Sequence, residues 1–221
     1  PRLRVFALAT FLFTSLLLFS GGYTTTIGAG MVFPDWPLSN GSLNPEGWLV
    51  NQDMAAEHSH RLFGMVVGLL TLVLAVWTWR VEPRRWVRRA ATVMLALVIL
   101  QGLLGGLRVL LVSTDLAMVH GCTAQLYLCS LATMVIAHLP RFRPRLAELG
   151  GDDHGLGPLT PLLFGLVFVQ LIIAAAMRHQ GAGLAIPTFP LTPEGSWLPS
   201  AGPPAVAIHF AHRAMALAIS V

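Results

Sequence analysis

Residues 54–79 read MAAEHSHRLFGMVVGLLTLVLAVWTW, an apolar run interrupted only near its start by ionisable side chains. About 20 apolar residues are enough to cross roughly 30 Å of hydrocarbon as an α-helix. Lipid offers no hydrogen-bonding partner to the backbone, and the run is continuous rather than alternating, so a helix is expected and a barrel strand is not. The stretch therefore predicts a transmembrane helix that carries Glu57, His58, His60 and Arg61 at one end.

The rest of the chain shares this apolar character. Hydrophobic residues make up 55% of the 221 residues and charged residues only 11%, against about 25% charged in an average soluble domain. We therefore predict an all-α, polytopic transmembrane helix bundle. The N-terminal run is too long for a signal peptide and no small-residue cleavage site follows it, so we interpret it as a retained helix. The further spans are expected near residues 4–24, 89–112, 115–139 and 158–178, with another beginning near Ala205 and still apolar at Val221.

All 14 basic residues are arginines, and most of them lie before the first span, between the second and third spans, or between the fourth and fifth spans. The loops at residues 28–53 and 179–204 contain no Lys or Arg. By the positive-inside rule, the N-terminus is expected in the cytoplasm and these two loops outside. Short arginine runs at helix ends do not form a continuous basic face, so nucleic acid is excluded as a partner and membrane lipid is expected. The arginines assigned to the cytoplasmic side are Arg2, Arg4, Arg80, Arg84, Arg85, Arg88, Arg89, Arg141, Arg143 and Arg145.

An internal repeat relates the two outer loops. GAGMVFPDWPL at residues 28–38 aligns with GAGLAIPTFPL at residues 181–191 at an offset of 153, with six identities in eleven positions. Each loop leads to a helix with a His-Arg pair, His60-Arg61 in the first copy and His212-Arg213 in the second. The repeat spans four helices, an even number, so the two copies run parallel about an axis along the membrane normal. This predicts an eight-helix protein, of which the sequence holds a first four-helix half at residues 1–140, a cytoplasmic linker at 141–157, and the start of a second half at 158–221, with five helices and part of a sixth present.

Two histidines of the first half are expected at one depth. His60 lies about two turns into its helix and His120 comes five residues after Asp115, which puts both roughly 8 to 10 Å from the outer interface. A charged group near a helix centre costs at least about 2.5 kcal/mol, so ionisable residues here are functional candidates. Two histidines at one level on different helices suit the two axial positions of a haem iron. Glu57, three residues before His60, shares its helix face.

Other interpretations of these residues are open at this point. Each histidine could hydrogen-bond a neighbouring helix instead of a metal. A zinc site of His60, His120 and Glu57 would match a known ligand set, although the second half repeats the His-Arg pair without a carboxylate. Arg61 could pair with a haem propionate or with Glu57, or extend to the interface, and the same choices hold for Arg213.

In the second half, His212 is the counterpart of His60. His209 precedes it by one turn, where the first half has Glu57. We expect His209 and His212 to face one cavity, with His209 as either a ligand or the partner of a ligand. The third helix carries three glycines that allow close approach of a neighbouring helix or a flat cofactor, namely Gly102, Gly105 and Gly106.

Several motifs together resemble the haem A synthases over essentially the whole chain: Gly21-Gly22, Thr24 to Thr26, GAG-x3-P-x2-PL, EHSHR, QGLLGGLR, VHGCTAQ and HFAHR. The resemblance implies a multi-pass oxidoreductase of the bacterial cell membrane, with two four-helix halves, which converts haem O to haem A by oxidising the methyl at ring position C8 to a formyl group. It implies His60, His120 and Glu57 as the catalytic residues of the first-half haem site. It also implies His212 as one ligand of a haem b in the second half, whose other ligand lies on an eighth helix.

The resemblance also bears on partners. A haem O synthase and assembly factors of an aa3-type cytochrome oxidase are expected, and the oligomeric state is open between a monomer and a homo-oligomer. Many family members have a cysteine pair in the first outer loop, but residues 28–53 contain none, so a redox role of that pair does not transfer. The alternative functions are a b-type electron-transfer subunit without catalysis and a haem carrier in oxidase assembly. The counterpart of His120 would fall near position 273, so we expect no stable bis-histidine haem in the second half of these 221 residues.

Overall fold

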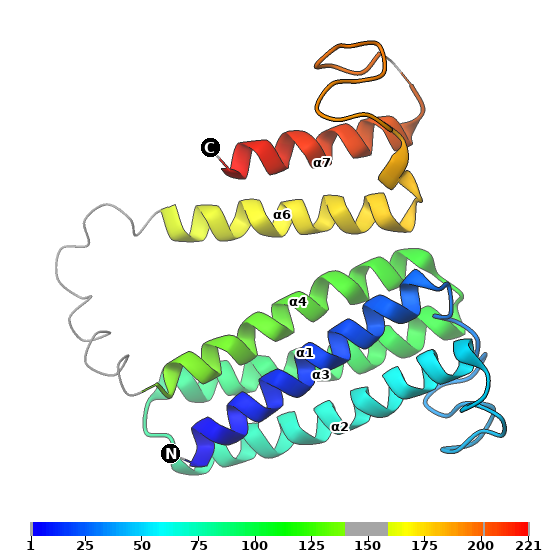
Figure 1. Cartoon of the computed structure of the whole chain (residues 1–221). Helices are drawn as coiled ribbons and strands as arrows, with labels where there is room; N and C mark the ends of the chain where they lie inside the picture. Colours follow the sequence, from blue (N-terminus) through cyan, green and yellow to red (C-terminus); the bar gives the residue numbers. More distant parts are fainter. Residues whose placement is uncertain (1, 140–158, 201, 221) are drawn as a thin grey trace. The chain divides into compact units, whose positions relative to one another are not determined.

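The computed structural model describes residues 2–139, 159–200 and 202–220, which form α-helices joined by loops and one short 3-10 turn (Figure 1). No strand forms within these residues, and five helices are long and apolar enough to cross a membrane. The prediction of an all-α, polytopic helix bundle is confirmed. The predicted linker at 141–157 lies outside the described residues. The elements are α1 (Arg2–Thr26), α2 (Gln52–Val81), α3 (Arg85–Leu110), α4 (Thr114–Ala137), α6 (Leu159–His179), η1 (Ala182–Leu184) and α7 (Pro204–Ser220).

Side-chain caps set where α2 and α4 begin. The Asn51 carboxamide oxygen accepts hydrogen bonds from two backbone N–H groups of the first turn of α2, both at 3.0 Å. The Ser113 hydroxyl accepts one from the first turn of α4 at 3.2 Å. Such caps satisfy backbone donors that the helix itself leaves unpaired. They fix the depth of the two histidines, because His60 follows Asn51 by nine residues and His120 follows Ser113 by seven, which is about 14 and 10 Å along the helix axes.

The chain divides into two units, Pro1–Glu148 and Leu149–Val221, and each is described by itself. In the first unit α1 packs on α2, α2 on α3, α3 on α4 and α4 on α1, so the four helices close into a ring (Figure 1). The backbones of α2 and α4 do not approach each other closely, and neither do those of α1 and α3. These are therefore diagonal pairs, which face each other across the axis of the bundle.

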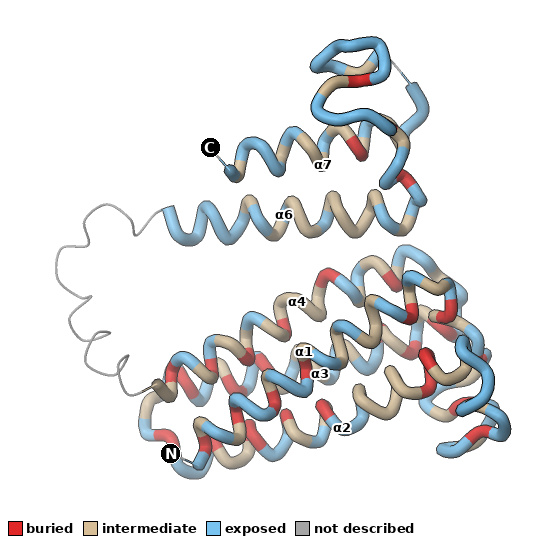
Figure 2. The backbone as a smooth tube through the Cα atoms, in the orientation of Figure 1, coloured by how far each residue is buried: buried red, intermediate tan, exposed pale blue. Residues whose placement is uncertain are grey.

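An apolar core fills the end of this bundle that holds the N-terminus and the connection from α2 to α3. It is built from the start of α1, the end of α2, the start of α3 and the end of α4 (Figure 2). Within it the hydroxyl groups of Thr71 and Tyr127 are hydrogen-bonded to each other, so these polar groups are satisfied. The members with no exposed surface are Ala7, Val67, Leu74, Ala75, Val87, Ala91, Met94, Leu131 and Met134. The histidines of interest lie at the other end, beyond this core.

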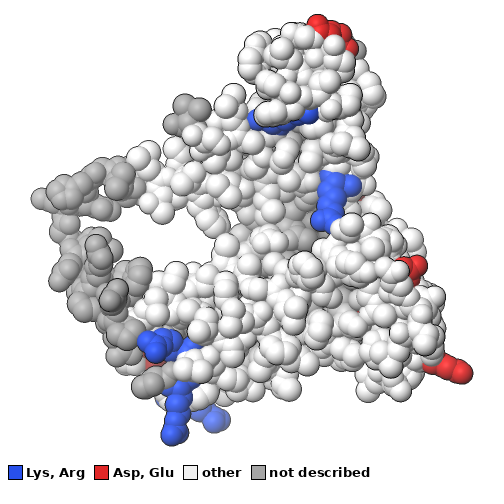
Figure 3. Space-filling model, viewed as in Figure 1, with Lys and Arg blue, Asp and Glu red and all other residues white. Residues whose placement is uncertain are grey.

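The outer surface of the first unit is apolar between its ends. Figure 3 shows basic side chains gathered at the end where α2 passes to α3, and a broad uncharged stretch of helix surface beside them. The first two turns of α3, at this end of the bundle, carry Arg85, Arg88 and Arg89. In the same connection a side-chain hydrogen bond of 2.6 Å from Arg84 lowers the pKa of Glu82 to about 2. A surface with charge at the ends and large apolar side chains between them is what a bilayer selects.

In the second unit α6 and α7 pack on each other, and η1 packs on both. α6 has no buried residue, and the buried residue of α7 is His209. The loop after η1 repeats a local feature of the first unit, since Trp36–Pro37 and Phe189–Pro190, at equivalent positions of the sequence repeat, are both cis peptide bonds.

Candidate functional site

The structure places His60 and His120 on diagonally opposite helices of the first unit, α2 and α4. Each imidazole lies against a glycine of a flanking helix. A Cβ added at Gly21 of α1 would lie 2.7 Å from Cε1 of His60, and one at Gly105 of α3 would lie 3.3 Å from Cε1 of His120. The first distance is shorter than any real contact and the second is tight, so these glycines make room for the two rings. Both rings are therefore held among the four helices of the bundle.

The two rings differ in their polar contacts. Nδ1 of His60 is buried and has no hydrogen-bond partner among the described residues. Beside His120, the side-chain amide of Gln101 lies 3.1 Å from Nδ1 and 3.0 Å from the backbone oxygen, and it also contacts the Thr123 hydroxyl at 2.5 Å. A buried imidazole nitrogen without a partner is costly unless a ligand binds it. Neutral imidazole nitrogens are common ligands of haem iron, so this donor set fits the two axial positions of a haem.

The structure does not assemble the alternative zinc site. Among the described residues, no three His, Cys, Asp or Glu side chains come together as a metal-binding group. The Glu57 carboxylate is hydrogen-bonded to the loop between α1 and α2, residues 27–51. We call this segment the first long loop.

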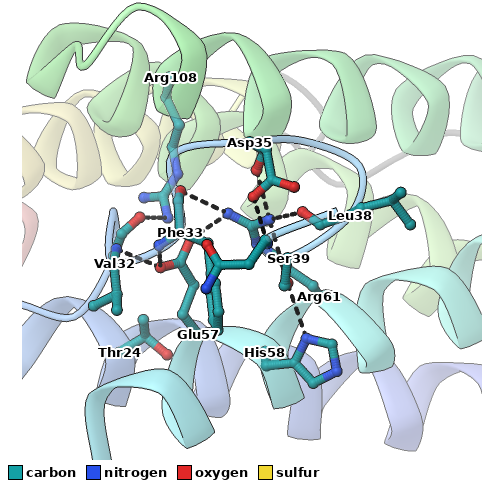
Figure 4. Close-up of polar contacts among 12 residues, drawn as sticks. Thr24, Val32, Phe33, Asp35, Leu38, Ser39, Glu57, His58, Arg61 and Arg108 are labelled. Atoms are coloured by element: carbon teal, nitrogen blue, oxygen red, sulfur yellow. Dashed lines mark hydrogen bonds and ion pairs between the residues drawn. The ribbon is translucent and has the colours of Figure 1, made fainter. Parts of the chain in front are cut away.

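Glu57 is hydrogen-bonded to that loop and to Arg61 (Figure 4). One carboxylate oxygen accepts hydrogen bonds from the backbone N–H groups of Val32 at 2.5 Å and Phe33 at 3.0 Å. The other accepts from the Arg61 guanidinium at 2.6 Å. The Glu57 residue is only 2% exposed. Its charge is thus neutralised by an arginine one turn away and by two peptide dipoles.

Arginine side chains bind the loop backbone at several points. Arg61 donates to the carbonyl oxygens of Asp35 at 2.7 Å, of Phe33 at 3.3 Å and of Leu38. From α3, Arg108 donates to the carbonyl oxygen of Gly30 at 2.9 Å. Of the roles considered for Arg61 from the sequence, pairing with Glu57 is the one seen here, and a contact of Arg61 with a haem propionate stays a prediction.

The loop is also held by its own side chains. The Asp35 carboxylate accepts hydrogen bonds from the backbone N–H groups of Asn40 and Gly41, both at 2.7 Å. Burial acts to raise the pKa of Asp35, but these bonds outweigh it and hold the pKa below its usual value. From α2, Nδ1 of His58 lies 2.9 Å from the Ser39 hydroxyl, and His58 is buried. The first long loop is therefore an ordered cap on the histidine-bearing end of the bundle.

In the second unit, His209 and His212 have different partners. Nδ1 of His209 accepts a hydrogen bond from the backbone N–H of Ile186 at 3.1 Å, and its Nε2 lies 3.2 Å from Nε of Arg213. Nδ1 of His212 lies 3.0 Å from the side-chain amide of Gln170 on α6. Of the two roles open for His209, ligand or partner of a ligand, the contacts show neither, and cofactor binding by His209, His212 and Arg213 stays a prediction.

Three side chains near these histidines did not emerge from the sequence as candidates: Gln101, Gln170 and Trp36. A signal was present for the glutamines, since an amide inside an apolar span requires a partner as a buried polar group does. For Trp36 the signal was the glycine pair in α3, because a Cβ added at Gly106 would lie 2.5 Å from Cδ2 of the indole. Of the three glycines expected to admit a close neighbour, Gly105 lies against the His120 ring and Gly106 against a loop tryptophan, whereas a Cβ added at Gly102 would meet nothing within 4 Å.

Comparison with known proteins gives a consistent result. Residues 4–221 match the model of the COX15-CtaA family, described as cytochrome oxidase assembly protein. The chain is similar to the haem A synthase of Geobacillus kaustophilus, with 30% identity over 204 residues, 89% of this chain and 62% of the relative. It is similar to the haem A synthases of Shouchella clausii, with 29% identity over 93% of this chain and 68% of the relative, and of Symbiobacterium thermophilum, with 32% identity over 96% and 70%. The chain thus spans between 62% and 70% of the length of these relatives.

Proposed function

This chain belongs to the COX15-CtaA family of cytochrome oxidase assembly proteins, and from that premise we propose that it is a haem A synthase, which oxidises haem O to haem A. The observation that carries the proposal is the pair of imidazoles from diagonal helices, each seated on a glycine, with a buried and unpartnered nitrogen on His60. The haem A synthases of three bacteria are between 29% and 32% identical to this chain over 89% or more of its length. Haem O is the proposed substrate and haem A the product.

In this proposal His60 and His120 hold the haem iron from opposite faces and so orient the ring within the bundle. The substrate's methyl group at C8 would be oxidised in two successive two-electron steps. With water as the oxygen source, each step replaces a C–H bond by a C–OH bond and releases two electrons and two protons, and the second step gives a gem-diol that loses water to leave the formyl group. Both steps require an electron acceptor. Glu57 is proposed to accept a proton, because a carboxylate has about four hydrogen-bonding sites and only three are used by Val32, Phe33 and Arg61.

The second unit is proposed to begin a haem b site that His212 would help to hold. Gln170, whose amide lies 3.0 Å from Nδ1 of His212, would fix the orientation of that ring. When bound there, haem b would supply electron-transfer chemistry, and His209 and Arg213 are proposed to help hold it. The domain division proposed from the repeat, at 1–140, 141–157 and 158–221, follows this assignment of one haem site to each half.

Orientation follows from the arginines. We propose that the protein lies in the bacterial cell membrane with the N-terminus and the Arg-rich α2–α3 connection in the cytoplasm, and the first long loop outside. The proposed partners, a haem O synthase and assembly factors of an aa3-type cytochrome oxidase, would deliver the substrate and take the product.

Extracting the pigment of the purified full-length protein tests the proposed function. Mass spectrometry is expected to find haem O and haem A together with haem B, because a synthase captured during turnover holds substrate and product. Haem B alone, in a host that makes haem O, would identify an electron-transfer subunit and overturn the proposal. Bound haem A without conversion of added haem O would indicate a carrier.

Gly21→Ala is expected to weaken binding of haem O by about 10-fold or more. The added methyl would lie 2.7 Å from Cε1 of His60, and overpacking of this kind costs about 1–3 kcal/mol, so the ring moves from its position. The matched control is Gly22→Ala, where an added Cβ meets nothing within 4 Å. Titration of haem into the two purified variants, followed at the Soret band, measures the difference. Equal affinities would show that His60 does not hold the haem from its present position.

A further inference from the structure

We propose that both halves of the repeat fasten their long loop with one and the same two-residue clamp, and that in the first half this clamp places Trp36 against the bound porphyrin. The clamp is Glu57 with Arg61 in the first half and His209 with Arg213 in the second. The placement of Trp36 rests on the proposed function, whereas the clamp itself does not. Glu57 thereby gains a positioning task that is separate from accepting a proton.

In the first half both clamp residues are hydrogen-bonded to the backbone of Phe33. Its N–H donates to the Glu57 carboxylate at 3.0 Å, and its carbonyl oxygen accepts from Arg61 at 3.3 Å. Glu57 and Arg61 come from consecutive turns of α2 and form a hydrogen-bonded ion pair at 2.6 Å. The Arg61 guanidinium also lies over the Phe33 ring, 5.4 Å from its centroid. Both polar groups of this loop residue are thus satisfied by the helix.

The second half repeats this arrangement at the equivalent residue, Ile186. Its N–H donates to His209 at 3.1 Å and its carbonyl oxygen accepts from Arg213 at 2.8 Å. Ile186 follows Phe33 by 153 residues, and both clamp residues follow their counterparts by 152. Glutamate and histidine can both titrate, but what the two positions share in this structure is that each accepts a hydrogen bond from the loop backbone. The common task of the two positions is therefore to hold the loop, and this explains why His209 turns to Ile186.

The two clamps differ in strength for a chemical reason. The Glu57 carboxylate accepts from Val32, Phe33 and Arg61 together. A neutral imidazole has one acceptor nitrogen, so His209 can accept fully from either Ile186 or Arg213 but not from both. The first clamp also joins opposite charges, which strengthens its hydrogen bonds. We expect the first long loop to be held more firmly than its counterpart in the second half.

The clamp holds Trp36 in place against α3. Arg61 binds the carbonyl oxygens of Asp35 and Leu38, on either side of Trp36. The indole packs on Gly106, and the His120 ring lies against the preceding residue of α3, Gly105. Trp36 is 38% exposed, so part of its aromatic surface is open to a ligand. Indole rings stack well on flat aromatic groups, and the indole is thus suited to contact a porphyrin held by His120.

Hydrogen exchange of the full-length protein, resolved to Val32, Phe33 and Ile186, tests the clamp. Glu57→Leu is expected to speed exchange at Val32 and Phe33 at least 10-fold. Glu57→His copies the second half and, if Glu57→Leu folds poorly, gives the same test, with intermediate protection at Phe33. The reverse substitution, His209→Glu, is expected to slow hydrogen exchange at the Ile186 N–H. Unchanged rates at Phe33 in both Glu57 variants, or at Ile186 in His209→Glu, would overturn the clamp.

Transfer of haem from the full-length protein to apomyoglobin tests the placement of Trp36. Trp36→Ala is expected to speed release of haem O about 10-fold, with the Soret maximum unchanged because the axial ligands remain. Arg61→Leu should do the same, and the double variant should release haem no faster than either single one, since coupled residues are not additive. Leu49→Ala, at a loop residue that is 75% exposed, is the control and should behave as wild type.

Release unchanged in Trp36→Ala, or rates that multiply in the double variant, would overturn the placement of Trp36 while leaving the clamp. A wild-type protein that takes up no haem O would instead contradict the proposed function. The exchange rates at Phe33 and Ile186 would still decide the clamp in that case, because they require no haem.

Discussion

Replacing either His60 or His120 by alanine in the full-length protein is expected to abolish haem A formation and to weaken binding of haem O at least about 100-fold. Loss of a hydrogen-bonding partner of a metal ligand alone costs 10- to 100-fold, and each of these variants removes a proposed axial ligand itself. No other side chain would replace the lost iron ligand, because no further described His or Cys joins His60 and His120 as a metal-binding group. Haem extraction and the Soret spectrum of each variant measure the loss.

His138→Ala is the matched control, since His138 caps the other end of the same helix as His120, where it contacts Met134 and Glu82. It is expected to keep haem O and its spectrum. Added imidazole should restore part of the spectrum in His60→Ala by filling the vacated position as an external ligand. Normal haem O content in both histidine variants would mean that the ligands lie elsewhere in the protein, and the assignment of the first unit as the substrate site would be wrong.

The helices could be predicted because a segment that crosses lipid must be apolar and about 20 residues long. Asn51 and Ser113 mark the starts of α2 and α4 through their caps. Rise per residue from these caps places His60 about 14 Å and His120 about 10 Å along the helix axes, which is deeper for His60 than the 8 to 10 Å expected for both. All of this is local information, carried by residues close together in the chain.

The partner of Glu57 could not be predicted in the same way. The i, i+3 spacing predicts that Glu57 shares a helix face with His60, but spacing does not say which distant segment folds back onto that face. The first long loop does so, and its backbone N–H groups reach the carboxylate. Sequence periodicity also does not show which helices are diagonal, so the relation of α2 to α4 required the packing of all four helices.

The repeat held more information than its identities suggested. Glu57 and His209 differ as residues, and comparing residue types alone points to two separate roles for them. Comparing what the two side chains accept, from Phe33 and from Ile186, shows one role in two chemical forms. An internal repeat is therefore compared most usefully by the hydrogen bonds that each position makes.

Glu57→Gln is expected to retain haem O while lowering haem A formation about 100-fold, the lower range for loss of a positioned acid or base. Glutamine keeps one acceptor oxygen, which can still bind the N–H groups of Val32 and Phe33. In the protein with Glu57 these groups lie 2.5 and 3.0 Å from the carboxylate. It cannot take up a proton at neutral pH, and its amide nitrogen would face Arg61 with donor against donor. The variant thus removes proton transfer while largely keeping the loop in place.

The measurement pairs haem A formation with hydrogen exchange at Phe33 in the same preparation. Exchange in Glu57→Gln within a few-fold of wild type, together with the large loss of activity, would assign the loss to proton transfer rather than to a displaced loop. Glu57→His completes the comparison, because it retains an acceptor for Phe33 and a group that titrates near neutral pH. If Glu57→Gln forms haem A at the wild-type rate, Glu57 has no part in the chemistry and its task is confined to holding the loop.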